Sequence, residues 1–359
     1  EKRFSIRNDV RCAGLEHKLG LHGSPTCTMV FGEGEGAVGY LVGEENQGLA
    51  GMFTMMNNAR LCVGLQGVAV AERACQRALA FARERRQGRA PGAARGEASA
   101  IILHPDIRRT LLRMKALTGA ARAICYQTAA ALDLARRAPD AEEGAAAQAR
   151  ADLLTPVAKA FSTDIGVEVA SLGVQVHGGM GFIEETGAAQ LYRDARVFPI
   201  YEGTNGIQAI DLATRKLPAG EGASVAAYIT EQRELLARLA ASGLPGLDRS
   251  AASLGRAFDA LERATGFMRD RAATAREQAL ASATPYLRLF GLAAGGAGLA
   301  RGALAAAEAG ESQGESQLML TRFYAEAIAP EASSLAEIVI EGAEVTLEAG
   351  ASVFAESVS

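Results

Sequence analysis

Glu202 is the acidic residue whose surroundings most suggest chemistry. It lies in FPIYEGTNGIQ, residues 198–208, after an apolar run and directly before a turn of glycine, threonine and asparagine. Two interpretations are open from these residues. The acid could favour the positive end of a helix that Thr204 caps. Alternatively, it could be a base in an apolar ligand cavity, where desolvation makes a carboxylate strong enough to remove a moderately acidic C–H proton.

Two other segments have residue types suited to a phosphate-bearing ligand. QVHGGMG, residues 175–181, has three glycines in four residues, so its backbone N–H groups can approach a ligand closely. RERRQGR, residues 83–89, carries four arginines, and the guanidinium fork matches pyrophosphate oxygens. Each segment also has a structural interpretation, as a turn that ends a helix or as a solvated helix end that complements the helix dipole.

The composition favours helices and disfavours several classes of partner. Of 359 residues, 49% are hydrophobic and 5% aromatic, with no Trp, so Ala, Leu and Val must build a core of closely packed helices. A net charge of −4 with interspersed signs gives no electrostatic reason to expect nucleic acid or an anionic membrane as a partner. The five cysteines include no CxxC pair and are expected to be reduced thiols in the cytoplasm.

Two further features concern targeting. Residues 292–300 are apolar, but this stretch is too short and too rich in Gly and Ala to predict a membrane span. The first residue is Glu rather than Met and no signal peptide is recognisable, which is consistent with a fragment or a processed product.

Hydrophobic periodicity divides the chain into a strand-rich start and a helical remainder. In residues 1–46, strands are expected at 28–31 and 37–42, joined by GEGEG, as the end of a larger β domain. Apolar residues then recur mostly at spacings of three and four, which predicts a four-helix bundle in residues 47–216. Its helices are expected at 47–86, at 106–137, after a loop at 139–144 up to 172, and at 204–216.

The segment LPAGEGAS, residues 217–224, is the expected boundary of an additional helical domain, residues 217–359. This part contains no His or Cys, so its expected role is packing or oligomerisation. The predicted fold class is therefore mainly α, with a remnant of a β domain, a four-helix bundle and a C-terminal helical domain. Helices of this last domain are expected at 224–241, 251–281, 285–308 and 315–348, the last interrupted near Pro330.

The order and spacing of these segments resemble the acyl-CoA dehydrogenase family over about residues 1–216. The most specific stretch runs from QVHGGMGF, which starts at Gln175, to LYRDARVFPIYEGTNGIQ, which ends at Gln208. KLGLHGSPTC and GYLVGEENQGL are typical of the last strands of the family's β domain and of the entry to its bundle. MMNNARLCVGLQGVA and the extended C-terminal tail are similar to the subgroup that contains methylthiopropanoyl-CoA dehydrogenase.

The resemblance implies FAD-dependent α,β-dehydrogenation of an acyl-CoA thioester to a trans-2-enoyl-CoA. Glu202 falls on the family's catalytic glutamate and would remove the Cα proton. Tyr201 would line the acyl cavity, and Arg60 matches an arginine near the thioester and the catalytic carboxylate. Thr204 falls at a flavin contact within the same subunit.

The same resemblance implies a cofactor site shared between subunits. Arg85 and Gln87 fall where the family contacts the FAD pyrophosphate, usually that of the neighbouring subunit. Gln175, Gly178 and Gly179 fall at the adenosine-side contact, likewise across a subunit boundary. A homo-oligomer, at least a dimer, is therefore expected, with electron-transfer flavoprotein as the implied electron acceptor.

Two departures from the family pattern bear on the base. Many members have Asp where this chain has Asn57, which alters the charge around Arg60. A minority of members place the base immediately before that arginine, where this chain has Ala59, which cannot act as a base. Glu202 therefore has no rival by this route. His177 has no paired ligand in the sequence and is expected to be structural rather than metal-binding.

Three alternatives remain open. An acyl-CoA oxidase differs in whether oxygen reaches the reduced flavin. A flavoprotein relative that binds nucleic acid would need a basic face, which the acidic balance disfavours. A non-catalytic fragment or scaffold would keep the bundle but lack the family's N-terminal helical domain and earlier β strands. Because those parts cover the flavin in the family, residues 1–359 alone are expected to bind FAD weakly or not at all.

Overall fold

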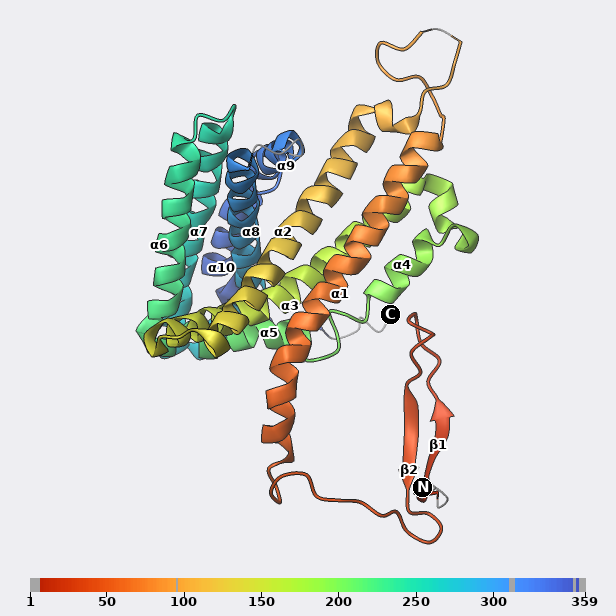
Figure 1. Cartoon of the computed structure of the whole chain (residues 1–359), viewed down its shortest axis with the longest axis vertical. Coiled ribbons are helices and arrows are strands. Elements are labelled where there is room, and N and C mark those ends of the chain that lie inside the picture. The colour runs from red at the N-terminus through yellow and green to blue at the C-terminus, as the bar shows by residue number, and fades with distance from the viewer. Residues whose placement is uncertain (1–6, 95, 310–313, 351–352, 355–359) are drawn as a thin grey trace.

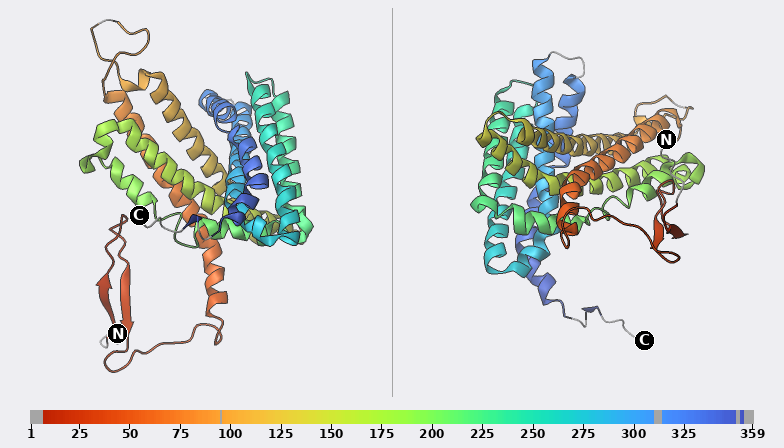
Figure 2. Two further views of the ribbon diagram at one scale, coloured as in Figure 1. Left: turned by 180° about the vertical axis from the view of Figure 1, so that it is seen from behind. Right: turned by 60° about the horizontal axis from the view of Figure 1, so that its bottom comes forward.

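The computed structural model describes residues 7–94, 96–309, 314–350 and 353–354. These residues form long helices and a two-stranded antiparallel sheet. The helices make two groups, α1–α5 and α6–α10, and the strand pair stands apart from both at the end of an extended segment (Figures 1 and 2). The predicted mainly α fold class is confirmed.

Three long helices build the bundle: α1 (Gly48–Glu84), α2 (Pro105–Arg137) and α3 (Ala141–His177). Helix α3 packs against both of the others. The backbones of α1 and α3 approach closely, since a Cβ atom added to Gly67 would lie only 2.4 Å from the carbonyl oxygen of Ser162. A larger side chain there would separate the two helices that carry most of the site described below. The predicted bounds of the first two helices nearly coincide with those of α1 and α2.

Helix α3 extends beyond its predicted end. The prediction placed this end at residue 172, but α3 continues to His177. Gly173 is accommodated inside the helix because α1 packs against it, and a Cβ atom there would lie 3.4 Å from that of Ala74. The helix ends at Gly178, whose φ of +59° favours glycine.

Short elements lead from α3 to the acidic turn. The 3₁₀ turns η2 (Gly178–Phe182) and η3 (Glu184–Thr186) precede α4 (Ala188–Ala195), which the sequence analysis did not predict. Then α5 (Asn205–Asp211) continues into the π-helical turn η4 (Leu212–Lys216), in place of the single helix expected at 204–216. Thr204 caps α5 as expected, because its Oγ1 accepts a hydrogen bond from the backbone N–H of Ile207 at 3.3 Å.

Helix α8 is the centre of the C-terminal part. It packs against α7, α9 and α10, and also against α2 and α5 of the bundle. The predicted junction between the helices at 251–281 and 285–308 is wrong, because Ala275 leaves helical geometry with a φ of −150° and α8 continues through Pro285. The predicted break near Pro330 is confirmed. The elements described here are the 3₁₀ turn η5 (Ala219–Gly222), α6 (Ala223–Ala241), α7 (Leu247–Thr274), α8 (Arg276–Glu308), α9 (Gly314–Ala327) and α10 (Glu331–Glu348).

Helix α8 is long and apolar enough to cross a membrane by length and composition, with a mean hydropathy of 1.3. However, 67% of its most apolar window is buried inside the structure, as in a core helix. Tyr286, Phe290 and Leu292 are fully buried and belong to a hydrophobic core that continues into the bundle. The division of the chain into separate units at residue 216 stays a prediction.

The N-terminal strands differ in part from the prediction. Strand β1 (Val10–Leu15) pairs with β2 (Cys27–Phe31), which confirms the strand expected at 28–31. The strand expected at 37–42 is wrong: these residues are irregular. The backbone N–H and carbonyl of Val38 hydrogen-bond to the side chain of Asn8, at 2.9 and 2.8 Å, instead of to a strand. The hairpin loop touches α4, because the N–H of Leu21 donates to the carboxylate of Asp194 at 2.6 Å.

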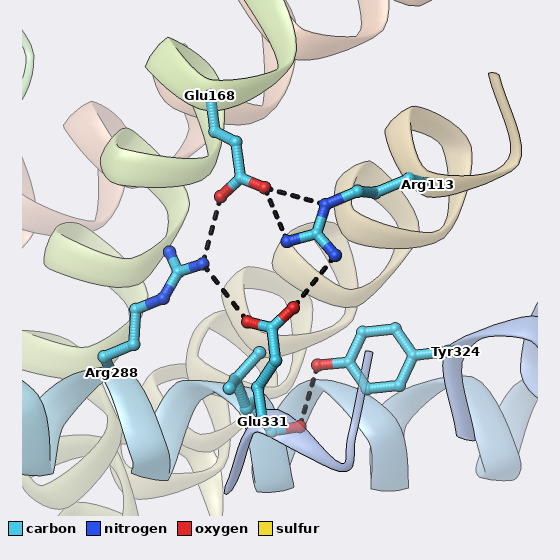
Figure 3. A network of polar contacts seen from close by, with 6 residues as sticks. Arg113, Glu168, Arg288, Tyr324 and Glu331 are labelled. Carbon is cyan, nitrogen blue, oxygen red and sulfur yellow. Dashed lines mark hydrogen bonds and ion pairs between the residues drawn. The ribbon is translucent and has the colours of Figure 1, made fainter. Parts of the chain in front are cut away.

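A ring of two arginines and two glutamates joins the C-terminal helices to the bundle (Figure 3). Arg113 of α2 donates to Glu168 of α3 and to Glu331 at the start of α10, each at 2.9 Å. Arg288 of α8 closes the ring, 3.0 Å from Glu168 and 3.9 Å from Glu331. The ring therefore links four helices, α2 and α3 of the bundle with α8 and α10 of the C-terminal part.

Candidate active site

Glu202 lies on a left-handed turn just before α5. Its φ is +54°, and that of Gly203, the next residue, is +81°. A residue with a Cβ atom is disfavoured in this region by roughly 1–2 kcal/mol. Such conformations occur mainly where the surrounding structure holds them and where function requires them. Contacts from neighbouring helices must therefore hold the turn at Glu202.

The apolar surroundings expected for Glu202 are present but open. Phe198 is buried, whereas Ile200 and Ile207, on either side of the acid in sequence, are 53% and 47% exposed. Glu202 itself is half-buried. In the part of the chain that the structure describes, the apolar side chains beside Glu202 still face solvent, so its predicted place in an apolar ligand cavity stays a prediction.

Tyr201 ties the turn to helix α1. Its hydroxyl hydrogen-bonds to the side-chain oxygen of Gln66, and its ring stacks on Phe198 with a centroid distance of 6.0 Å. Burial raises the pKa of Tyr201, and the nearby negative charge of Glu202 raises it further, while the hydrogen bond to Gln66 opposes both. Tyr201 therefore remains a hydrogen-bond donor. Its predicted place in an acyl cavity stays a prediction.

Arg60 lies on the buried side of α5. Its Nη1 is 3.1 Å from Oδ2 of Asp211, and the two side chains are only 6% and 3% exposed. Arg215 also approaches Asp211, with Nε 2.7 Å from Oδ1, outside the angles of a hydrogen bond. Arg60 is thus an internal partner of α5, and its predicted role near a thioester stays a prediction. The side chain of Asn57 is not among the side chains that the structure describes.

The residues predicted to contact a phosphate-bearing ligand come together at the C-terminal end of α1. A cavity of about 680 Å³ is lined by Arg85, Gln87, Gln175, Gly178 and Gly179. Two segments almost ninety positions apart in sequence therefore meet at one site.

The backbone presents this site in a defined way. The N–H of Gln87 donates to the carbonyl of Ser99 at 3.0 Å, and the carbonyl of Arg85 accepts from Ile101 at 2.8 Å, so residues 85–87 are held in an extended conformation. A Cβ atom built on Gly178 or Gly179 would meet no other atom within 4 Å. The glycine backbone is therefore open to a ligand.

His177 forms part of the wall of the same cavity. Its Nδ1 lies 2.7 Å from the carbonyl oxygen of Gly173, and its ring stacks on Phe81 with a centroid distance of 4.5 Å. These contacts give His177 a structural role, in which its side chain packs at the end of α3. No group of three potential metal ligands occurs among the residues that the structure describes.

The acidic turn and the glycine-rich cavity are far apart within one chain. Gln66, which contacts Tyr201, and Arg85, which lines the cavity, are separated by 19 positions along and just beyond α1. At 1.5 Å per residue, this corresponds to roughly 28 Å. The cavity therefore lies at the C-terminal ends of α1 and α3, whereas the acidic turn lies beside the middle of both helices.

Sequence reasoning missed the residues beneath the acidic turn. Lys159 of α3 is 0% exposed and donates hydrogen bonds to the carbonyl of Gly203 and to the side chain of Asn205, both at 2.9 Å. Asn205 in turn donates to Asp164 at 2.7 Å. The available signal was a lysine within the otherwise apolar run LLTPVAKAF, residues 153–161, because a charge there needs a specific partner.

Comparison with known proteins agrees with this arrangement. Residues 46–217 match the model of the acyl-CoA dehydrogenase C-terminal domain, and residues 223–349 match that of the acetyl-CoA dehydrogenase C-terminal-like domain. The chain is 48% identical to 3-methylmercaptopropionyl-CoA dehydrogenase of Ruegeria pomeroyi over 302 residues, which are 84% of this chain and 50% of the relative. The chain thus spans about half the length of that relative.

Two solved structures share the fold. One is ACDH-11 of Caenorhabditis elegans in complex with C11-CoA, with a TM-score of 0.75 and 21% identity, covering 95% of this chain and 55% of that one. The other is an acyl-CoA dehydrogenase of Bacillus anthracis complexed with FAD, with a TM-score of 0.73 and 22% identity, covering 96% and 58%. From the two domain models matched in order and the similarity to the Ruegeria protein, the chain belongs to the acyl-CoA dehydrogenase family.

Proposed function

We propose that this chain carries the catalytic base of an FAD-dependent acyl-CoA dehydrogenase, and that Glu202 removes a proton from Cα of an acyl-CoA thioester. The observation that carries the proposal is the placement of Glu202 on a left-handed turn that α3 and α1 hold through hydrogen bonds to Gly203 and Tyr201. Loss of the Cα proton together with a hydride from Cβ leaves a trans-2-enoyl-CoA. Glu202 lies within residues 46–217, the segment that matches the C-terminal domain of the acyl-CoA dehydrogenases.

The apolar segment around Glu202 suits this reaction. A thioester α-proton is too weakly acidic for a fully hydrated carboxylate to remove easily. Ile200 and Ile207 are exposed here and would be covered by an acyl chain, which would exclude water from the half-buried carboxylate. FAD, when bound, supplies the acceptor for the hydride that leaves Cβ.

The cavity at the end of α1 has the chemistry that the polar end of FAD requires. Arg85 offers a guanidinium group, Gln87 and Gln175 offer amides, and Gly178 and Gly179 leave their backbone open. The Bacillus relative of similar fold is itself complexed with FAD. We therefore assign the pyrophosphate and adenosine contacts to these five residues, and a flavin contact to Thr204.

The separation of the two half-sites supports a homo-oligomer. A flavin ring is joined to its pyrophosphate by one ribityl chain, which cannot bridge the roughly 28 Å along α1. The polar cavity of one chain would therefore serve the flavin at Glu202 of a partner chain. We propose that the protein forms at least a dimer. We also propose that it is located in the cytoplasm and that electron-transfer flavoprotein accepts the electrons of its reduced flavin.

Acyl-CoA is the proposed substrate class, since the named Ruegeria relative is an acyl-CoA dehydrogenase and the Caenorhabditis neighbour is complexed with C11-CoA. The test is reduction of an artificial electron acceptor by the full-length protein with a series of saturated acyl-CoA substrates. Activity that survives in Glu202→Gln at near the wild-type rate would remove this residue from the proposed role.

A further inference from the structure

Lys159 is a buried cation whose hydrogen bonds go to the acidic turn. It lies in the middle of α3 between Ala158 and Ala160, and all three residues are 0% exposed. An isolated ammonium group is costly to bury, so the side chain must lie where hydrogen-bond acceptors meet it. Both acceptors of its Nζ belong to the turn: the carbonyl of Gly203 and the side chain of Asn205, each at 2.9 Å.

The carbonyl that Lys159 binds belongs to Gly203, the residue directly after Glu202. The peptide groups on either side of Gly203 determine where the backbone of the acid points, and both Glu202 and Gly203 have positive φ. Gln208 also approaches the turn, but its Nε2 is 3.4 Å from the carbonyl of Glu202 and 3.5 Å from that of Gly203. Lys159 therefore makes the shorter contact of the two to the carbonyl of Gly203.

Asn205 extends the same contact into α3. Its Nδ2 donates to the carbonyl of Ala160 at 3.1 Å, to Thr163 Oγ1 at 3.0 Å and to Asp164 Oδ1 at 2.7 Å, while its Oδ1 accepts from Lys159. The first residue of α5 is thus bonded to four residues of α3. Lys159 alone among these four also reaches the carbonyl next to Glu202.

We propose that Lys159 is a positioning residue that fixes the left-handed turn of Glu202 by binding the carbonyl of Gly203 and the side chain of Asn205 together. The proposal rests on the proposed function of Glu202 for its catalytic consequence, but the positioning of the turn is a property of the contacts alone. Lys159 does not need to touch substrate or cofactor for this role.

The test compares Lys159→Met with Lys159→Gln and with the control Lys115→Met, in the full-length flavin-loaded protein. Methionine has a similar length without donors, and glutamine keeps one donor group. Lys115 is an exposed residue of α2 outside the site. The first readout is the hydrogen exchange of the backbone amides of Asn205, Ile207 and Gln208, which are bonded within the turn.

Lys159→Met is expected to accelerate exchange of these amides about tenfold or more, with Lys159→Gln between it and the wild type and Lys115→Met unchanged. Turnover should fall by about 10–100-fold in Lys159→Met while KM for acyl-CoA changes little, because misplacement of a reacting group lowers the rate of the chemical step. A general loss of packing would instead accelerate exchange throughout α3 and α5.

Unchanged exchange in the turn, or acceleration in Lys115→Met as large as in Lys159→Met, would overturn the proposal. If Lys159→Met does not fold, exchange of the same amides is compared between Lys159→Gln and the wild type, and unchanged exchange in Lys159→Gln overturns the proposal. The outcome also separates the two claims. Faster exchange of the turn in Lys159→Met alongside full activity of Glu202→Gln would support the positioning role and reject Glu202 as the base.

Discussion

Arg60 and Asp211 form a buried ion pair between α1 and the end of α5, with Nη1 3.1 Å from Oδ2. The two side chains are only 6% and 3% exposed, so the charge-assisted contact between them is shielded from water. Asp211→Asn removes the negative charge from this contact and is therefore expected to lower the free energy of unfolding by about 1.5–3 kcal/mol. Denaturant unfolding measures this change.

The control for this prediction is Asp106→Asn. Asp106 pairs with Arg109 on the surface of α2, where the side chains are 79% and 59% exposed, and such pairs contribute about 0.2–1 kcal/mol. Equal losses in the two variants would contradict the burial argument for Arg60 and Asp211.

The ring in Figure 3 is expected to couple the C-terminal helices to the bundle. Arg113→Met removes the hydrogen bonds to Glu168 and Glu331 and should lower the free energy of unfolding by about 1–3 kcal/mol. Arg109→Met, on the same helix but exposed, should lower it by no more than about 0.2–1 kcal/mol, the contribution of its surface pair with Asp106. If both substitutions have the same effect, the ring contributes nothing beyond a surface charge.

Lys159 gives the unfolding free energy a specific pH dependence. The pKa of Lys159 falls from 10.5 to about 8, mainly because the side chain is buried; Asp164 on α3 and Glu202 on the turn oppose this fall, while Arg60 on α1 adds to it. Below about pH 8 both the folded and the unfolded chain hold the proton, and the cost of burying the ammonium is fully present. Between about pH 8 and 10.5 the unfolded chain binds more protons, so folding becomes more favourable as pH rises.

The measurement is the difference in unfolding free energy between the wild type and Lys159→Met as a function of pH. The difference should be constant below about pH 8 and then shift in favour of the wild type, by up to about 1.4 kcal/mol per pH unit. A difference that stays flat up to pH 10.5, or that moves the other way, would show that Lys159 keeps an ordinary pKa.

A site shared between subunits predicts complementation. Glu202→Gln retains the polar cavity, and the double variant Arg85→Ala/Gln87→Ala retains Glu202. At limiting FAD each should be nearly inactive alone. Mixed oligomers made by co-expression with two tags should regain activity, because one of their sites combines Glu202 from one chain with Arg85 and Gln87 from the other. Purified mixed oligomers without activity would mean that both half-sites act within one chain.

The candidate site residues that the sequence suggested all belong to local motifs. Glu202, Arg85 and Gly179 lie in short segments whose composition suggests chemistry by itself, and the structure brings the cavity residues together as expected. Thr204 was also predicted correctly as a helix cap, because capping depends on a side chain and a backbone group three residues apart.

Other features depend on contacts that no short segment reveals. Periodicity treats Lys159 as a polar position, whereas the structure buries it because acceptors from residues 203 and 205 meet it. The junction of α7 and α8 falls at Ala275, which carries no glycine or proline signal. The strand expected at 37–42 has suitable residues but pairs with no strand in the described part of the chain, since pairing depends on a partner strand.

The most direct test of Glu202 as the base is the anaerobic reduction of bound flavin by a saturated acyl-CoA, followed by visible absorbance in a stopped-flow instrument. The matched control is Glu221→Gln, since Glu221 has a φ of +55°, close to that of Glu202, but lies in the 3₁₀ turn η5 before α6. Both variants should retain flavin and wild-type thermal stability. Glu202→Gln is expected to slow flavin reduction by at least about 10²–10⁴-fold, while Glu221→Gln reduces flavin at the wild-type rate. Reduction by Glu202→Gln within about tenfold of the wild type would contradict the assignment of Glu202 as the base.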